Sequence, residues 1–227
     1  MTRGHAFVAD LERPALDDGD RHHLERVLRL RAGDELTVSD GRGGWRLCRF
    51  GPDLEIAGPV DRESAPAPRL TVAFAVTKGA RPEWTVQKLT ELGVDEIVPF
   101  VAGRSVVKWD DARAPRHTER LRRVAREAAM QSRRTWLPQV PELATFATVA
   151  ARSGAVLLDG DATAPPSLDH GVLLIGPEGG WDEEERASGL PSVRLGPRVL
   201  RAETAAVAAA ALWCALRAGI VAPEREI

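Results

Sequence analysis

The chain has 227 residues, of which 44% are hydrophobic and 28% are charged, and its formal net charge is −2. This length suits one large domain or two smaller ones, and the composition is that of an ordinary globular protein. Two distant cysteines, without a CxxC pair or a Cys/His cluster, argue against a disulfide scaffold and a metal site. The chain lacks a signal-peptide core and any apolar run of about 18 residues, so we expect a cytoplasmic protein that does not enter a membrane.

Residues 1–66 predict a small β-barrel that carries one helix. Residues 36–50 contain two apolar-rich runs around glycine turns, which is a hairpin pattern. Residues 55–60 add a short strand. Apolar residues recur at helical spacing within residues 22–30, which indicates a short amphipathic helix.

Residues 67–227 predict an α/β domain with a mostly parallel sheet, preceded by a proline-rich linker at 64–70. Near-continuous apolar runs are typical of strands that are buried on both faces. The expected strands are 70–76, 96–101, 154–159, 171–176 and 192–196, and the expected helices are 82–94, 117–134 and 204–219.

The expected helices carry recognisable ends and apolar faces. Pro82 suits a first helical turn, and Gly93 suits a C-cap. The expected core-facing residues are Trp84, Leu89 and Leu92, then Leu121, Val124, Ala128 and Met130, then Leu212 and Leu216.

The turn GPEGGW follows the apolar run at 171–176. Ligands of open α/β sheets bind beyond the carboxyl ends of the strands, where glycines let the backbone approach a ligand. Asp182 is placed to cap the next helix, and three glutamates occupy its first turn. A phosphate would be repelled there, so a nucleotide-phosphate enzyme is the weaker interpretation.

A second turn, LGPRVLRAETAA at 195–206, also follows a short strand. Thr204 is placed to cap the alanine-rich helix behind it, and the alanines favour close packing, in part against another subunit. Because both turns end strands of one domain, they predict a ligand site together.

The stretch from Arg104 to Arg134 holds ten basic residues and four acidic ones in an otherwise near-neutral chain. Such a segment attracts an anionic polymer such as nucleic acid. A solvated helix face is the alternative for any one of these arginines.

The stretches LLIGPEGGW, LGPRVLRAETA and KGARPEWTVQKLTELGV resemble the RsmE-type methyltransferases of the SPOUT class. The resemblance covers nearly the whole chain and includes a PUA-like N-terminal barrel. It implies a trefoil-knotted α/β domain, S-adenosylmethionine as cofactor, a homodimer, and methylation of uridine N3 in 16S ribosomal RNA of the small subunit. The cofactor-binding residues that it implies are Leu174, Ile175, Gly176, Gly179, Gly180, Leu195, Gly196, Leu200 and Ala205.

The resemblance also implies which side chains carry the chemistry. Uracil N3 holds a proton, so the site must stabilise a developing anion or provide a base. Arg201 is expected to stabilise the charge, and Glu203 or Glu178 to hold that arginine or accept the proton. The residues expected to bind RNA are Arg3, Arg26, Arg29, Lys78, Lys88, Arg104, Arg123, Arg126, Gln131 and Arg133.

Three departures from the family pattern stand out. Trp181 replaces an expected phenylalanine, Ala202 replaces an expected threonine, and the extreme N-terminus lacks an expected proline and aromatic residue. None of them removes an argued catalytic group. A non-catalytic RNA-binding or ribosome-assembly module of the same fold is the alternative function.

Overall fold

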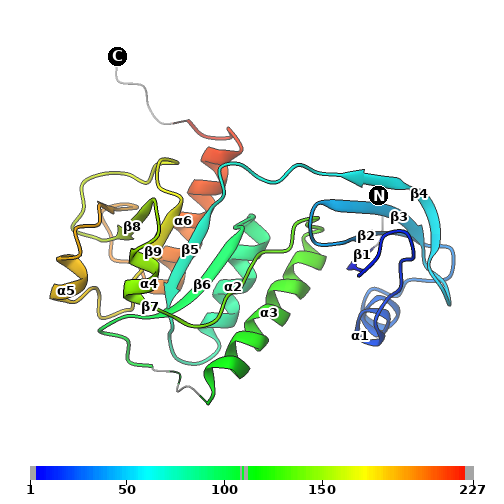
Figure 1. The fold of residues 1–227 in the computed structure, drawn as a ribbon, viewed down its shortest axis with the longest axis horizontal. Coiled ribbons are helices and arrows are strands. Elements are labelled where there is room, and N and C mark those ends of the chain that lie inside the picture. Colours follow the sequence, from blue (N-terminus) through cyan, green and yellow to red (C-terminus); the bar gives the residue numbers. More distant parts are fainter. Residues whose placement is uncertain (1–3, 108, 110–111, 223–227) are drawn as a thin grey trace. The chain divides into compact units, whose positions relative to one another are not determined.

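The computed structural model describes residues 4–107, 109 and 112–222. Contacts within the chain separate two compact units (Figure 1). The first unit comprises residues 1–66 and 126–137, and the second comprises residues 67–125 and 138–227. Helix α3 (Ala114–Gln131) therefore contributes to both units.

The first unit is built on a four-stranded sheet in the order β1-β2-β3-β4. Strand β1 runs parallel to β2, and the other neighbours are antiparallel. The hairpin and the third predicted strand are confirmed, whereas β1 was not resolved as a separate strand by the sequence pattern. The strand bounds are Gly4–Phe7 (β1), Glu35–Ser39 (β2), Gly44–Arg49 (β3) and Glu55–Arg62 (β4).

The predicted helix at 22–30 begins earlier and ends earlier. It consists of α1 (Asp18–His22) followed by one π-helical segment, η1 (His23–Val27). The side chain of Asp17 caps α1 by accepting a hydrogen bond from the Asp20 backbone N–H. Of the three apolar residues expected to face inward, only Leu24 is buried; Val27, the last residue of η1, and Leu28, which follows it, are exposed.

The second unit contains a six-stranded sheet in the order β10-β8-β9-β5-β6-β7, in which every pair is parallel (Figure 1). The α/β prediction is confirmed, with the two-residue strand β7 added. The bounds are Thr71–Ala75 (β5), Glu96–Val101 (β6), Ala144–Thr145 (β7), Ala155–Leu158 (β8), Val172–Ile175 (β9) and Ser192–Val193 (β10).

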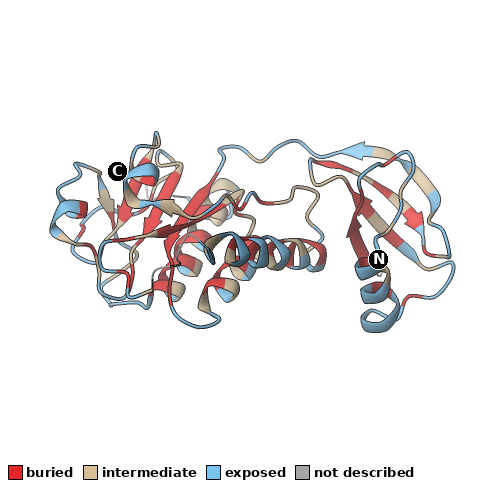
Figure 2. Cartoon of the chain, turned by 60° about the horizontal axis from the view of Figure 1, so that its bottom comes forward, coloured by how far each residue is buried: buried red, intermediate tan, exposed pale blue. Residues whose placement is uncertain are grey.

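The central strands β5 and β9 are buried at every residue, as the continuous apolar runs predicted (Figure 2). Alternate side chains enter two different cores, because successive residues of a strand point to opposite faces. In β9, Ile175 belongs to one core and Leu174 to the other.

The helices that the described residues of this unit form, wholly or in part, are α2 (Arg81–Leu92), α3, α4 (Phe146–Ala150), α5 (Glu183–Arg186) and α6 (Ala202–Arg217). As predicted, Pro82 lies in the first turn of α2, and Gly93 caps its end with φ 102°. The prediction that Trp84 faces the core is wrong, since 44% of its surface is exposed. Leu89 fills the predicted place, with no exposed surface.

The expectations for α3 and α6 hold in part. Leu121, Ala128 and Met130 are buried, while Val124 is half-buried. On α6 the buried residues are Trp213 and a row of alanines that packs against α2, rather than Leu212 and Leu216, which are half-buried. Trp213 has no exposed surface, and its Nε1 donates to the Ser167 carbonyl at 3.0 Å.

Within the described ranges, no helix has the length and apolar character needed to cross a bilayer. The same part of the chain contains no group of three or more His, Cys, Asp or Glu side chains arranged to hold a metal ion.

Candidate functional site

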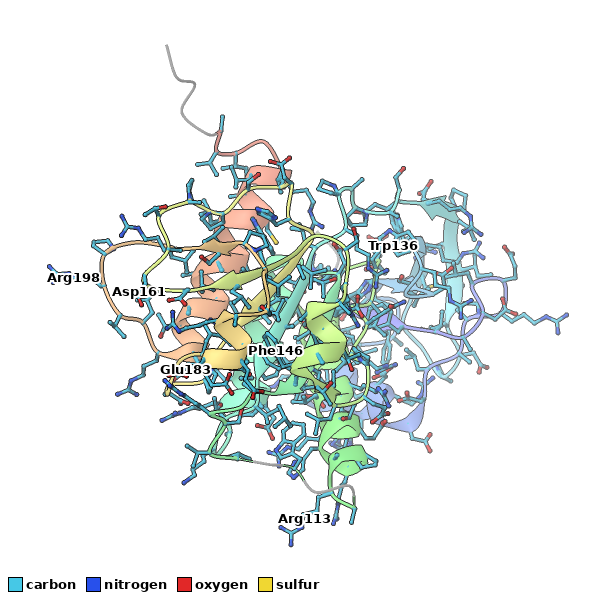
Figure 3. The ribbon with its side chains drawn as sticks, turned by 60° about the vertical axis from the view of Figure 1, so that its left-hand side comes forward. Arg113, Trp136, Phe146, Asp161, Glu183 and Arg198 are labelled. Atoms are coloured by element: carbon cyan, nitrogen blue, oxygen red, sulfur yellow. The ribbon has the colours of Figure 1, made fainter. Side chains whose placement is uncertain are left out.

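A pocket of about 250 Å³ lies at the carboxyl ends of β8 and β9. Three segments form it: residues 158–161 after β8, residues 175–181 after β9, and residues 194–205, which lead from β10 into α6. Figure 3 shows Asp161 and Arg198 on two of these loops. The carboxyl ends of parallel strands lie at the same edge of a sheet, so the two glycine turns meet as predicted.

The structure brings most of the predicted cofactor residues together. Ile175, Gly176, Gly180, Leu195, Gly196, Leu200 and Ala205 all line the pocket. Leu174 does not, because its side chain points into the opposite core. Gly179 does not line it either: its carbonyl accepts a hydrogen bond of 3.2 Å from Arg104 Nη1.

The turn after β9 depends on two glycines and a tryptophan. A Cβ on Gly176 would lie 3.1 Å from the indole of Trp181, and Gly180 adopts φ 69°, which disfavours other residues. Trp181 is only 2% exposed, stacks with Phe100, and donates from Nε1 to the Leu158 carbonyl at 2.9 Å. The indole therefore ties the end of β8 to the turn after β9, which gives Trp181 a packing role at the pocket wall.

Helix α5 begins with the predicted cap. Asp182 accepts a hydrogen bond from the Glu185 N–H at 2.8 Å, and the Glu185 carboxylate accepts from the Asp182 N–H at 3.0 Å. The other oxygen of the buried Glu185 accepts from the Gly103 N–H at 2.8 Å. This reciprocal cap fixes the end of the loop that carries Gly180.

Gly103 was not singled out from the sequence, yet a Cβ there would lie 1.8 Å from Asp182 Oδ2. We expect Gly103→Ala to destabilise the protein by about 3 kcal/mol, since it adds a steric clash to the loss of a helix cap. Urea unfolding measures this change. Gly160→Ala is the matched control, because its Cβ meets no atom within 4 Å. Equal stability of the two variants would contradict the role of Gly103.

Arg81, at the start of α2, links both proposed acids. Its Nη1 lies 2.5 Å from Glu178 Oε1, and its Nε lies 3.6 Å from Glu203 Oε1. Glu178 lines the pocket, while Glu203 Oε2 is buried without a hydrogen-bond partner in the described structure. The arginine that both glutamates contact in the described structure is Arg81 of α2, so their assignment to Arg201 or to the proton stays a prediction. Arg81 lies inside the stretch KGARPEW, but its sequence position did not reveal this pairing.

Arg201 is exposed and occupies the N-cap of α6, between the pocket residues Leu200 and Ala202. Its backbone is extended there, and its side chain makes no capping hydrogen bond. Thr204 lies inside the helix rather than at the cap, because α6 begins two residues earlier than the alanine-rich pattern suggested.

The charged lining of the pocket is balanced. Asp159, Asp161 and Glu178 face Arg186, Arg194 and Arg198. Arg186 is already paired with Asp159 at 2.5 Å and lies 3.6 Å from Asp161. Such a lining lacks the excess of positive charge that a polyphosphate requires, which agrees with the argument from the acidic start of α5.

The residues expected to bind RNA fall into two groups. The exposed residues are Arg26, Arg29, Lys78, Arg104, Arg123, Gln131 and Arg133, and Arg133 adopts φ 57°. Lys88 is half-buried and pairs with Glu91 at 2.8 Å. Arg3 lies outside the described residues.

Arg126 has a structural role that a count of charges did not reveal. Its guanidinium donates to both oxygens of Asp20, at 2.6 and 2.5 Å, inside the first unit. The hydrogen bond with Asp20 raises the pKa of Arg126 above its ordinary value, although burial opposes the shift. Because Asp20 is almost fully buried, this pair fastens the end of α3 to α1.

We expect Arg126→Met to lower the free energy of unfolding by about 2 kcal/mol, because it leaves the Asp20 carboxylate buried and unpaired. Arg123→Met, three residues earlier and exposed, is the control and should change stability by less than about 0.5 kcal/mol. Adding Asp20→Asn should restore part of the loss at Arg126. If the two single variants unfold alike, the pair contributes nothing to stability.

Comparison with known proteins decides the family. The family model for an RNA methyltransferase domain matches residues 63–214, and that for an RNA methyltransferase PUA domain matches residues 16–52. Ribosomal RNA small subunit methyltransferase E of Mycobacterium tuberculosis is 35% identical over 219 residues, which cover 86% of this chain and 84% of that protein. The Bacillus subtilis protein of the same name is 32% identical, covering 81% and 82%. The chain belongs to the ribosomal RNA small subunit methyltransferase E family.

Solved structures agree with this family. The family member from Neisseria gonorrhoeae, solved bound to S-adenosyl methionine, is 29% identical and superposes with a TM-score of 0.81 over 94% of this chain and 97% of that one. A Legionella pneumophila putative methyltransferase, in complex with the same cofactor, is 26% identical with a TM-score of 0.78, covering 95% and 98%. The resemblance on which the site prediction rested is thus confirmed at the level of the family.

Proposed function

We propose that this protein transfers a methyl group from S-adenosylmethionine to N3 of a uridine in 16S ribosomal RNA. One observation carries the proposal: two glycine turns of a methyltransferase-family domain form a pocket at the carboxyl edge of its sheet. Two similar proteins, from Neisseria gonorrhoeae and Legionella pneumophila, were solved with S-adenosylmethionine. The choice of uridine N3 rests on the family resemblance.

The residues of the pocket fit this cofactor. Ile175, Leu195 and Leu200 supply apolar surface for a neutral adenine, and Gly180 and Gly196 leave backbone groups open to a ligand, since no atom lies near their missing Cβ positions. The balanced acids and arginines suit a zwitterionic amino-acid tail and a sulfonium better than a phosphate. When bound, the cofactor supplies an electrophilic methyl group.

The chain's own groups must then deal with the proton and the charge of uracil. Arg201 lies between two pocket-lining residues with its guanidinium exposed, so we assign it to stabilise the negative charge that develops on the uracil carbonyls. Glu178 lines the pocket, and we assign it as the candidate acceptor of the N3 proton. Glu203, held by Arg81 and largely buried, is the weaker candidate, and we assign it to support the start of α6.

RNA binding is assigned to the exposed basic residues of both units. We propose residues 1–66 as a PUA-like RNA-binding domain and residues 67–227 as the methyltransferase domain, in keeping with the family matches at 16–52 and 63–214. Arg26 and Arg29 serve the first, and Arg104 and Arg123 the second. Phosphate contacts of this kind make affinity fall as salt rises.

The proposal includes a trefoil knot in the C-terminal part and a homodimer, both on the family resemblance. Val199 is fully exposed and its neighbour Leu200 is 39% exposed, on a loop that lines the pocket. Exposed apolar side chains at a ligand site favour cover by a second subunit. Light scattering on the purified protein reports the number of subunits.

A non-catalytic RNA-binding module is the alternative function. Calorimetric titration with S-adenosylhomocysteine separates it from an enzyme, since a module without a cofactor site would give no heat of binding. The decisive experiment incubates the purified protein with S-adenosylmethionine and small ribosomal subunits or free 16S RNA from cells that lack the gene. Mass spectrometry of the digested RNA should reveal N3-methyluridine, and an unmodified product would reject the proposal.

A further inference from the structure

A second pocket, of about 310 Å³, lies in the same unit and has no part in the cofactor site. It is lined by Thr77, Lys78, Gly79, Pro82, Glu83, Val107, Trp109, Arg113, His117 and Arg120. Its first three residues directly follow β5, which pairs with β9. Both pockets therefore open at the carboxyl edge of one parallel sheet, beyond the ends of the adjacent strands β9 and β5.

The first turn of α2 separates the two pockets. Arg81 reaches Glu178 on the cofactor side, whereas Pro82 and Glu83 line the second pocket. The two pockets thus lie on either side of one helical turn, whose pitch is about 5.4 Å. A polymer that places one monomer at the cofactor pocket can therefore place an adjacent monomer in the second pocket.

Two aromatic rings form a platform in this pocket. Trp109 and His117 stack with centroids 4.6 Å apart and an angle of 17° between their planes, and both are half-buried. Aromatic faces of this kind bind bases by stacking, largely independently of base identity. Trp109 packs against the edge of the larger core, which holds the indole in place, and both rings of the pair keep part of their surface exposed.

Positive charge surrounds the platform. Lys78 is exposed on the turn after β5, and Arg113 projects outward before the start of α3 (Figure 3). Arg120 pairs with Glu83 at 2.9 Å, and among the described residues that line this pocket Glu83 is the only acid. Three cations against one carboxylate favour an anion beside the stacked rings.

We propose that this pocket binds a second nucleotide of the single-stranded RNA whose target base enters the cofactor pocket. The base stacks on the Trp109–His117 platform, and Lys78 contacts the adjoining phosphate. This inference rests on the proposed function and adds to it, because it states how the strand is held beside the reacting base.

The test measures binding of a short single-stranded oligouridine to the full-length protein by fluorescence anisotropy over a range of salt concentrations. Trp109→Leu should weaken binding about tenfold, as the loss of one base stack does. Lys78→Ala should reduce the slope of log affinity against log salt by about 0.7, the value for one phosphate contact on a single strand. Both variants should keep wild-type affinity for S-adenosylhomocysteine.

Matched controls are available in the same unit. Trp84→Leu removes an exposed tryptophan from α2 outside both pockets, and Arg152→Ala removes one cation that pairs with Glu96. Neither should change oligouridine binding by more than about twofold. Thermal unfolding of every variant identifies any loss of folding, and Lys78→Ala, at an exposed position, stays informative if Trp109→Leu does not fold.

Several outcomes would overturn the inference. Unchanged affinity and salt slope in both variants would remove the pocket from RNA binding. Uridine monophosphate or inorganic phosphate binding as tightly as the oligouridine, and losing affinity in Lys78→Ala, would make it a site for a free anion instead. If the wild-type protein does not bind S-adenosylhomocysteine, the proposed function fails, which is a different result from either of these.

Discussion

Arg201→Ala is expected to lower kcat by about 100-fold while the dissociation constant of S-adenosylhomocysteine changes less than threefold. Removing one preorganised donor from a developing oxyanion typically has an effect of this size on turnover. Arg201 is exposed at the start of α6, between Leu200 and Ala202 of the pocket wall, and makes no capping hydrogen bond. Its removal should therefore lower the rate of the chemical step much more than it changes cofactor affinity or folding stability.

Single-turnover methylation of 16S RNA at saturating cofactor measures this effect. Arg201→Lys should fall between the wild type and the alanine variant, because lysine keeps the charge but loses the planar fork of donors. Arg198→Ala is the informative comparison: Arg198 lines the pocket itself, so its loss should act mainly on cofactor affinity. Normal turnover of Arg201→Ala would take this residue out of the mechanism.

Structural features whose cause lies in neighbouring residues, such as strands, turns and helix caps, were predictable from the sequence. The continuous apolar runs that became β5 and β9 fixed the parallel sheet, and the two Gly-Pro turns after β9 and β10 located the pocket at its carboxyl edge. Local chemistry was equally readable at Asp182, which caps α5, and at Gly93, which ends α2. In each case the cause lies within a few residues of its effect.

Properties that depend on distant residues were not predictable. Arg126 and Arg123 look alike in a count of charges, but only the fold brings Asp20 to Arg126 across 106 positions of sequence. Trp84 has the spacing of a core residue, yet α6 covers α2 with alanines and Trp213 and leaves Trp84 exposed. Arg81 meets Glu178 across 97 positions, so the pairing of the proposed acids depends entirely on tertiary structure.

Arg81→Ala is expected to raise the dissociation constant of S-adenosylhomocysteine about tenfold. The guanidinium contacts Glu178 in the turn after β9 and Glu203 in the first turn of α6, the two elements that form opposite walls of the pocket. Without it, two carboxylates remain without their shared cation, and Glu203 already has one buried oxygen that lacks a partner. The two walls then lose their common attachment to α2. Because Arg81 and Glu178 are each 42% exposed, the loss in stability should be only about 1 kcal/mol.

Calorimetric titration, compared with the unfolding midpoint, separates a positioning role from general destabilisation. Arg120→Ala is the matched control, since it breaks the pair with Glu83 in the same turn of α2 but lies outside the cofactor pocket. It should leave the affinity for S-adenosylhomocysteine unchanged. In a Glu178→Gln background, Arg81→Ala should add less than in the wild type, because one of the two contacts is already weakened. Equal loss of affinity in the Arg81 and Arg120 variants would mean that Arg81 acts only through stability, whereas retained affinity in Arg81→Ala would show that the pocket walls are held without it.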